Sequence, residues 1–553
     1  MALVTEQVAA KTPLTGEERM VIVASSVGTV FEWYDFYLYA TLAPFFATLF
    51  FPKGNDTAAL LSAFAAYAAG FLVRPFGALV FGRIGDIIGR KYTFLVTIMV
   101  MGMSTFGVGL LPTYATIGWW APIIMVSLRL LQGLALGGEY GGAATYVAEH
   151  SAPNRRGYNT SWIQTTATVG FFLCLGIIFA CRTTMTKEAF ATWGWRIPFW
   201  MSIALLGVSV WIRLKLHESP VFTKMKAEGK GSKAPLTDSF LKYPNNKYAL
   251  LALLGATMGQ GVVWYTGQFY ALFFLQITLK LDFTVTYILI GTSLLLGTPF
   301  FIFFGWLSDK IGRLKIIMAG CLIAACTFFP MFKALTHYVN PALEKFQYNT
   351  QITVAGNRAD ETFNLFVGPW SKFTELDRVN DFFGKQGLNF TKITPEAGKM
   401  VVATIQGKNP KTGQIVTTRV EGFNKDTEAT LKKALTELGY PKEADRTQVN
   451  YPMTLLILFV FLIYVTMVYG PIAAFLVELF PTNIRYTSMS LPYHIGNGWF
   501  GGMLPLFATA LVAFHGNIYY GIWYPVIIAL ITVVIGSLFL KETKDRDIST
   551  YEH

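Results

Sequence analysis

The stretch that decides the fold reads GRIGDIIGRK over residues 82–91, and it returns as GWLSDKIGR over residues 305–313. Both copies fit the pattern G-x-x-x-D-x-x-G-R. A second pair also repeats, because Glu149 and Glu478 are each followed within a few residues by a proline and an arginine. Two copies of each pair predict a chain of two related halves, which is an architecture of secondary transporters.

The spacing of the repeats locates an interruption in the second half. Gly82 and Glu149 are 67 residues apart, whereas Gly305 and Glu478 are 173 residues apart. The excess of 106 residues is close to the length of the polar segment 336–450, which carries 15 Lys and Arg and 13 Asp and Glu. We therefore expect one inserted domain there.

The composition indicates an integral membrane protein. Of the 553 residues, 53% are hydrophobic and only 14% are charged, against about 25% charged in soluble proteins. Disorder is excluded by the 15% share of aromatic residues. Twelve apolar stretches are long enough to cross a bilayer as helices, at roughly 20–42, 57–81, 92–111, 118–146, 158–181, 194–215, 248–278, 283–305, 314–334, 453–477, 486–514 and 519–540.

We expect an all-α polytopic fold of twelve transmembrane helices in two six-helix bundles, with a small extracytoplasmic α+β insertion between helices 9 and 10. Lys and Arg concentrate in the alternate short loops that would share the side of the N-terminus, so both termini are expected in the cytoplasm. The expected divisions are a first bundle at 1–212, a basic cytoplasmic linker at 213–247, the second bundle at 248–335 and 451–553, and the insertion at 336–450.

Part of the insertion has a readable secondary structure. The runs 400–406 and 414–421 flank a glycine-containing turn and predict a β-hairpin. Asp426 is the expected cap of a helix that runs to about Leu438, with Gly439 behind it.

The repeated loops predict a cytoplasmic gate. An Asp can bind the N-terminal amides of a helix, and an Arg can pair with a carboxylate such as Glu149 or Glu478. This pairing would form a latch that is closed in one state and broken in another, whereas the alternative is a static ion pair. The gate residues expected from this pattern are Asp86, Arg90, Glu149, Asp309, Arg313, Glu478 and Arg485, with Arg74 and Glu139 nearby. Glu139 is expected to pair with the loop 82–91.

Taken together, these loops resemble those of the major facilitator superfamily. Further segments are similar to its metabolite:proton symporter family, which includes carriers of α-ketoglutarate, citrate, shikimate and proline/betaine. These segments are FEWYDFY at 31–37, RPFG at 74–77, RLLQG at 129–133, GGEYGG at 137–142, WRIPF at 195–199 and HESPVF at 217–222. The resemblance covers the chain except for 336–450 and implies proton-driven transport by alternating access.

Ionisable residues at membrane depth are costly and point to function. Glu32 and Asp35 lie three residues apart and share one face of the first span, which Tyr39 continues. Arg129 lies near the middle of the fourth span, with Gln132 one turn away. A carboxylate beside an arginine can exchange a proton for its counter-ion. We expect Asp35 or Glu32 to carry the proton and Arg129, Gln132 and Tyr39 to bind substrate, the alternative being a permanent salt bridge.

The spans of the second half are almost free of charge. Gln260, Tyr265 and Gln268 form the best polar cluster, in the seventh span, and we expect them to orient the substrate. The alternative for each is a hydrogen bond between helices.

The leading hypothesis is a secondary transporter that takes up a small organic acid with protons. A zwitterion such as proline or betaine, a proton-antiport exporter, and a membrane sensor that uses the outer domain remain alternatives. We expect no enzyme activity and no cofactor, because the chain has no phosphate-binding loop and no ligand-spaced His or Cys. The net charge of +12 is explained by the cytoplasmic loops, so no nucleic-acid partner is expected. A monomer in a bacterial inner membrane is expected.

Overall fold

The computed structural model describes residues 16–50, 56–357, 361, 374–393 and 400–550. Within these residues, ten helical stretches are long and apolar enough to cross a membrane, from Arg90–Leu110 to Tyr520–Phe539. Two further long helices precede them, α1 (Gly16–Phe50) and α2 (Asp56–Ile87). The prediction of a mostly helical, multi-pass membrane protein is confirmed.

The first half is a bundle around α5 (Trp120–Glu149), which packs on α2 and on α3 (Arg90–Leu110). The close approach of α2 and α5 depends on Gly137, where an added Cβ would overlap the backbone of Arg74 and Ala78. The other elements of this half are α4 (Tyr114–Ile117), α6 (Arg156–Gln164), α7 (Thr166–Thr184), α8 (Lys187–Thr192) and α9 (Ile197–Leu214).

The linker between the halves begins slightly later than the expected boundary at residue 212. Arg213 lies in the last turn of α9 and its side chain is fully buried, so it belongs to the first bundle. The segment that follows holds α10 (Pro220–Ala227) and α11 (Pro235–Phe240), and α12 (Asn245–Ala252) leads into the second half.

The second half begins with a helix that is repeatedly widened. Three π-helical turns, Leu253–Thr257, Thr266–Tyr270 and Phe274–Thr278, flank α13 (Met258–Tyr265) and α14 (Ala271–Phe273). A further π-helical turn, Ile495–Gly502, follows α22 (Arg485–His494). Such turns occur often at functional sites. The remaining long elements are α15 (Phe283–Ile311), α16 (Arg313–Val339), α20 (Tyr451–Tyr469), α21 (Ile472–Leu479), α23 (Leu504–His515) and α24 (Trp523–Phe539).

A four-stranded sheet lies between α16 and α20 in the chain, with strand order β2-β1-β3-β4. The predicted hairpin is confirmed as β3 (Val402–Lys408) and β4 (Ile415–Glu421), which pair antiparallel. β1 (Thr350–Ala355) pairs antiparallel with β3 and parallel with β2 (Thr391–Ile393). The helices that accompany the sheet are α17 (Pro341–Asn349), α18 (Glu375–Lys385) and α19 (Lys425–Glu437).

The predicted cap of α19 is wrong by two residues. Asn424 is the N-cap, and it forms a reciprocal capping box with Thr427. The expected end is correct, because Gly439 follows the helix with a φ of 81°.

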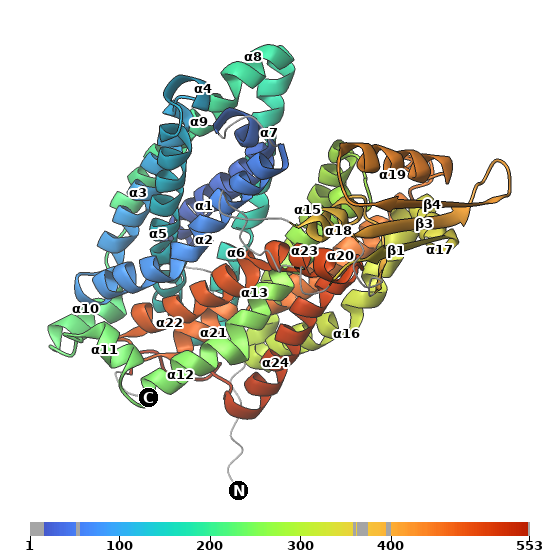
Figure 1. Cartoon of the computed structure of the whole chain (residues 1–553). Helices are drawn as coiled ribbons and strands as arrows, with labels where there is room; N and C mark the ends of the chain where they lie inside the picture. Colours follow the sequence, from blue (N-terminus) through green and yellow to red (C-terminus); the bar gives the residue numbers. More distant parts are fainter. Residues whose placement is uncertain (1–15, 51–55, 358–360, 362–373, 394–399, 551–553) are drawn as a thin grey trace, which may run out of the picture.

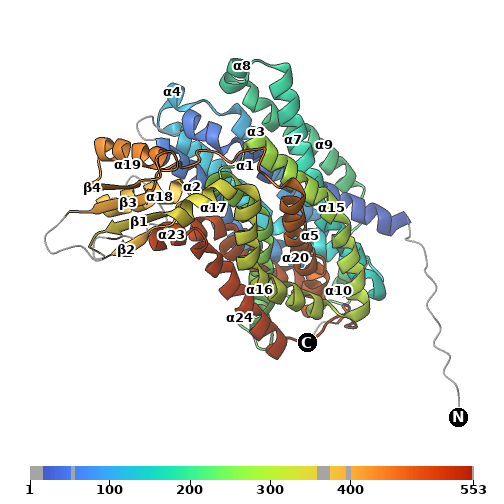
Figure 2. The ribbon, with the colours of Figure 1, turned by 90° about the vertical axis from the view of Figure 1, so that its right-hand side faces the viewer.

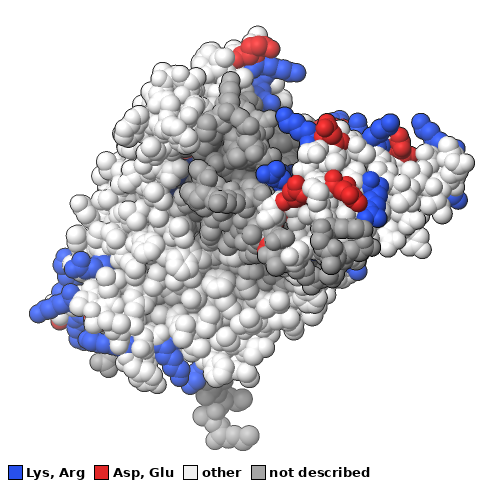
Figure 3. Space-filling model, in the orientation of Figure 1, with Lys and Arg blue, Asp and Glu red and all other residues white. Residues whose placement is uncertain are grey.

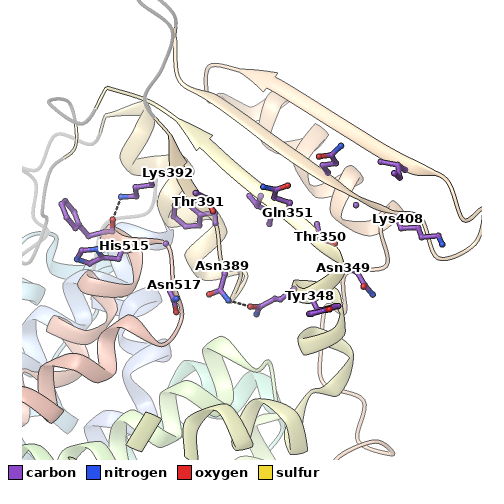
Figure 4. Close-up of a pocket in the computed structure, with 18 of the residues that line it drawn as sticks. Tyr348, Asn349, Thr350, Gln351, Asn389, Thr391, Lys392, Lys408, His515 and Asn517 are labelled. Carbon is purple, nitrogen blue, oxygen red and sulfur yellow. Dashed lines mark hydrogen bonds between the residues drawn. The ribbon is translucent and has the colours of Figure 1, made fainter. Parts of the chain in front are cut away.

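The sheet and its helices lie against one end of the second half, far from α10–α12 (Figures 1 and 2). The Ala444 amide donates to the Lys280 carbonyl at 3.0 Å, and the Phe390 amide donates to the Gly516 carbonyl at 2.8 Å. Arg446 pairs with Asp282 at 2.8 Å. An open groove of about 1110 Å³ separates β1 from the end of α23 (Figure 4).

Charged side chains gather at the two ends of the molecule (Figure 3). Lys and Arg surround α10–α12 at one end. At the other end, both positively and negatively charged side chains lie on α8 and on the four-stranded sheet with its accompanying helices. On the face that Figure 3 shows, the described surface between these ends is largely uncharged, which agrees with a membrane-spanning belt.

Candidate functional site

The first buried ion pair joins α1 and α5. Arg129 donates to Asp35 at 3.1 Å, and both side chains are almost fully buried. Gln132 completes the network, because it donates to Asp35 at 3.1 Å and to Thr105 at 2.7 Å and accepts from Arg129. The Arg129 guanidinium also lies 3.6 Å from the centre of the Tyr39 ring. Four of the five residues expected to act together in these two spans, all but Glu32, are therefore in contact.

A second ion pair lies one helical turn away on α1. The closest nitrogen–oxygen distance between Arg74 and Glu32 is 4.0 Å, and Arg74 lies over the Phe71 ring. Arg74 also lines a small cavity together with Asp35 and Arg129. Arg74, expected in or near the cytoplasmic gate, therefore lies beside Glu32 and close to Asp35 and Arg129.

Glu139 has a different partner from the one expected. It pairs with Arg213 of α9 and accepts a hydrogen bond from Thr97 at 2.9 Å. Arg213 also lies 3.4 Å from the centre of the Phe94 ring. Glu139 therefore connects α3, α5 and α9 inside the first half, rather than the loop 82–91, because the buried Arg213 is nearer to it.

The three polar residues of the seventh span do not form one cluster. Gln260 exchanges two hydrogen bonds with Asn497, at 3.0 and 2.8 Å, within the second half. Gln268 instead accepts from Tyr37 of the first half at 3.3 Å. Tyr265 packs edge-on against Phe71 of the first half. The π-helical turn at Thr266–Tyr270 changes the side-chain register between Tyr265 and Gln268.

Aromatic rings fill the centre of the contact between the halves. Trp33 meets Trp264 with ring centres 4.9 Å apart, and Phe36 meets Phe269 at the same separation. Tyr493, whose hydroxyl lies 2.8 Å from that of Tyr469, stacks on Tyr140 of the first half at 3.8 Å. The sequence reasoning did not assign this layer, although the aromatic run FEWYDFY at 31–37 is a signal for it.

The two repeated loops each cap a helix of the opposite half. Asp86 accepts from the backbone amides of Tyr486 and Thr487, at 3.3 and 2.8 Å, at the start of α22. Asp309 accepts from the amides of Gly157 and Tyr158, at 2.9 and 2.8 Å, at the start of α6. A carboxylate at a helix N-terminus is favourable. The two contacts are equivalent by the internal repeat.

The glutamates and arginines of the expected gate form ion pairs that repeat in the two halves. Glu149 lies 2.8 Å from Arg485 of the second half and 3.6 Å from Arg90 of its own half. Glu478 lies 3.0 Å from Arg313 of its own half and 3.6 Å from Arg156 of the first half. The expected gate residues Asp86, Arg90, Glu149, Asp309, Arg313, Glu478 and Arg485 are thus brought together. Arg156, not assigned before, joins them.

Two further glutamates brace the loops. Glu218 accepts from the amides of Arg90 and Lys91 at 3.2 Å each. Glu542 accepts from the amides of Arg313 and Leu314 at 2.8 and 3.1 Å. The sequence signal that was missed is a third repeat, Leu-x-Glu-Ser at 216–219 and Leu-x-Glu-Thr at 540–543.

Each brace requires a glycine beside it. Gly89 and Gly312 have φ values of 148° and 113°, and an added Cβ would meet Glu218 or Glu542. The second glycine of the repeated pattern is therefore explained by backbone conformation and space.

The comparisons with known proteins agree with this geometry. A family model described as "Sugar (and other) transporter" matches residues 20–239 and 435–553. The chain belongs to this family. The shikimate transporter of Escherichia coli (strain K12) is 36% identical over 323 residues, which span 57% of this chain and 72% of that protein. The alpha-ketoglutarate permease of the same organism is 35% identical, over 58% of this chain and 72% of that protein.

A further relative and a solved structure are also similar to this chain. The proline/betaine transporter of Salmonella typhimurium is 34% identical, over 57% of this chain and 65% of that protein. The major facilitator superfamily proton:xylose symporter XylE, bound to 6-bromo-6-deoxy-D-glucose, superimposes with a TM-score of 0.60 at 14% identity, covering 97% of this chain and 98% of that chain. The chain therefore has the fold of the major facilitator superfamily, whose members are transporters and not enzymes.

Proposed function

We propose that the protein takes up a small organic acid together with protons, by alternating access. The observation that carries the proposal is the buried Asp35–Arg129 pair with its Gln132 and Thr105 bonds. A carboxylate that exchanges its arginine for a proton changes the charge next to the binding site. The freed guanidinium of Arg129 then binds a substrate carboxylate by charge-assisted hydrogen bonds.

The acid would bind at the contact between the halves. The cavity beside Asp35 has a volume of only about 20 Å³, so it cannot hold an organic acid in this conformation. Separation of the aromatic layer would open a site between Arg129 and Tyr39 on one side and Tyr265 and Gln268 on the other. Polar groups in an otherwise apolar pocket orient such a ligand.

The loops 82–91 and 305–313 would form the cytoplasmic gate, closed in this conformation. The proposal places both termini in the cytoplasm, counts twelve spans, and puts the unit of residues 336–450 on the outer side. It ends the first bundle with α9 at Leu214, keeps the second bundle at 248–335 with 451–553, and puts the linker between them on the cytoplasmic side. We propose a monomer that acts in the bacterial inner membrane without a cofactor.

A zwitterion is the second candidate substrate. Aromatic faces bind quaternary ammonium groups. Trp33, which follows Glu32 directly in the chain, packs against Trp264, and Trp264 packs against Tyr265. A betaine-like ligand would place its cation there and its carboxylate on Arg129. The proline/betaine transporters among the relatives support this option.

Uptake into proteoliposomes tests the proposal. Purified protein, under an inward proton gradient, is offered a mixture of di- and tricarboxylates, keto acids, aromatic acids, proline and betaine, and the lumen is analysed by mass spectrometry. Accumulation of an acid that requires the gradient and disappears in Asp35→Asn supports symport. Accumulation of betaine alone favours the zwitterion, and accumulation only under an outward gradient in inverted vesicles favours export.

A further inference from the structure

Two buried arginines of the first half line the same cavity. The cavity of about 20 Å³ beside Asp35 is lined by Arg129 of α5 and by Arg74 of α2. Arg129 donates through Nη1 to Asp35 and to Gln132. Arg74 approaches Glu32 through Nη1 only to 4.0 Å, which is beyond hydrogen-bonding distance. The two guanidiniums therefore face one space but differ in how firmly the protein holds them.

Arg74 has hydrogen-bond donors that the protein does not use. A guanidinium carries five N–H groups, and within the described residues Arg74 Nε is buried and has no hydrogen-bond partner. Arg90 and Arg213 also leave Nε without a partner, but both donate hydrogen bonds through Nη1. Buried polar atoms almost always have a partner, so the unused donor of Arg74 needs an explanation.

Arg74 lies about one helical turn from Arg129 along the contact of α2 with α5. An added Cβ at Gly70 would lie 3.5 Å from the Arg129 carbonyl oxygen, and one at Gly137 would overlap the carbonyl oxygen of Arg74. Gly70 and Arg74 are separated by one turn of α2, which is about 6 Å at 1.5 Å per residue. This spacing is close to the distance between the two carboxylates of a short dicarboxylate such as glutarate.

The second half places an unpartnered imidazole near Arg74. His494 of α22 is 1% exposed, and within the described residues neither of its ring nitrogens has a hydrogen-bond partner. It lies beside the Gly137 carbonyl and within electrostatic range of Arg74. Tyr265 packs against Phe71, over whose ring the Arg74 guanidinium lies. Separation of the halves at this contact would therefore open one space to both Arg74 and His494.

We propose that Arg74 binds a second carboxylate of the substrate and that His494 donates a hydrogen bond to the same group. Arg129 binds the first carboxylate, as in the proposed function, on which this inference rests. The planar fork of an arginine matches a carboxylate with two parallel hydrogen bonds. The ligand uses the Nε side of Arg74, while Glu32 stays near Nη1. The protein then selects acids with two carboxylates, because a monocarboxylate or a betaine leaves Arg74 without a ligand.

Binding measured without a proton gradient tests this assignment. Isothermal titration calorimetry of the purified protein in detergent compares succinate, glutarate and adipate with butyrate, valerate and hexanoate, which have the same chain lengths but one carboxylate each. The wild type should bind at least one dicarboxylate about tenfold or more tightly than its matched monocarboxylate, as a hydrogen bond to a charged group predicts.

Substitutions of Arg74 should remove this preference. Arg74→Gln should bring the two affinities within about twofold of each other while the monocarboxylate affinity is unchanged. Arg74→Lys keeps the charge without the fork, so it should retain part of the preference. Because Arg74→Gln leaves Glu32 buried without its cation, the double variant Glu32→Gln/Arg74→Gln is titrated in parallel and should show the same loss. Arg378→Gln, exposed on α18, is the matched control and should bind as the wild type does.

The outcomes separate this inference from the proposed function. If the wild type takes up acids with protons but binds monocarboxylates as tightly as dicarboxylates, or if the Arg74 variants keep the preference, the inference is overturned while symport stands. Equal loss of both classes of acid in the Arg74 variants would also overturn it, because Arg74 would then hold the site together. If dicarboxylate binding depends on Arg74 but no gradient drives accumulation, symport fails and the inference stands. If the wild type neither binds nor takes up any of these acids, both fail.

Discussion

The two halves share the paired loops 82–91 and 305–313 but differ in their buried polar residues. In the first half, three buried ion pairs, Asp35–Arg129, Glu32–Arg74 and Glu139–Arg213, lie within the helices. In the described part of the second half, ion pairs occur at helix ends, and the interior holds neutral pairs such as Gln260–Asn497. Since charges are expensive at membrane depth, their concentration in one half supports the proposal that this half carries the proton.

The second half is distinguished by its π-helical turns. Its π-helical turns widen the helix that contains Tyr265 and Gln268 and the one that contains Asn497. Both helices contact the first half, the former through Tyr37 and Phe71 and the latter through Trp499, which donates to the Leu72 carbonyl. The buried ion pairs are thus concentrated in the first half and the π-helical turns in the second.

The largest effect is expected when the Asp35–Arg129 pair of the first half is broken. Asp35→Asn should lower gradient-driven uptake at least about 100-fold, as expected for a group that carries the transferred proton. Arg129→Gln should leave a buried unpaired carboxylate and cost about 3–5 kcal/mol of stability. Proteoliposome uptake and thermal unfolding measure the two effects. Normal uptake by Asp35→Asn would break the assignment of the proton to this half.

Substitutions in the repeated loops 82–91 and 305–313 test the feature that the two halves share. Asp86→Asn and Asp309→Asn should each weaken bonds to amides of the opposite half, at about 1.5–3 kcal/mol for a charged acceptor. Because the two contacts are equivalent, both variants should lengthen the distance between spin labels at Ile88 and Ile311, which are exposed on the two loops. A change in only one variant would show that the two copies of the loop differ in function.

In the second half, replacing both members of the Gln260–Asn497 pair should cost less stability than replacing either one alone. Gln260→Leu or Asn497→Leu alone strands a buried amide and should cost about 1–3 kcal/mol, whereas the double variant should be close to wild type. Thermal unfolding of the three variants measures the coupling. If the double variant loses as much stability as the two single variants lose together, the two amides are not energetically coupled.

The smallest effect is expected at the exposed ion pair between Asp282 and Arg446. The amide of Val285 and the guanidinium of Arg446 hold the pKa of Asp282 below its usual value. The stabilisation is therefore present above the unfolded pKa and is lost as pH falls through the lower folded pKa. Asp282→Asn should lower stability by about 0.2–1 kcal/mol at neutral pH, as exposed pairs do. The difference from the wild type should begin to shrink as the pH falls below about 4, the usual pKa of an Asp carboxyl, which unfolding at neutral and at acidic pH checks.

The periodic features of the fold were predictable from the sequence. Long apolar runs identify helices because a bilayer accepts almost nothing else, and the hairpin at 402–421 follows from local turn chemistry. The cap at Asn424 was missed because Asn424 and Asp426 are both good caps and only the backbone conformation distinguishes them. The contacts among Asp35, Tyr39, Arg129 and Gln132 were predictable from charge and depth in the membrane.

By itself, the sequence determined that this protein has two related halves, that it spans a membrane, and which ionisable residues are buried there. Only the tertiary structure decided the partners. Glu139 pairs with Arg213, and Asp86 binds amides at the start of α22, some 400 residues away in the chain. The π-helical turns were also decided there, since they set which neighbour Tyr265 and Gln268 meet. The physical reason is that composition and spacing fix the cost of burying a charge, whereas its partner depends on how helices distant in sequence approach one another.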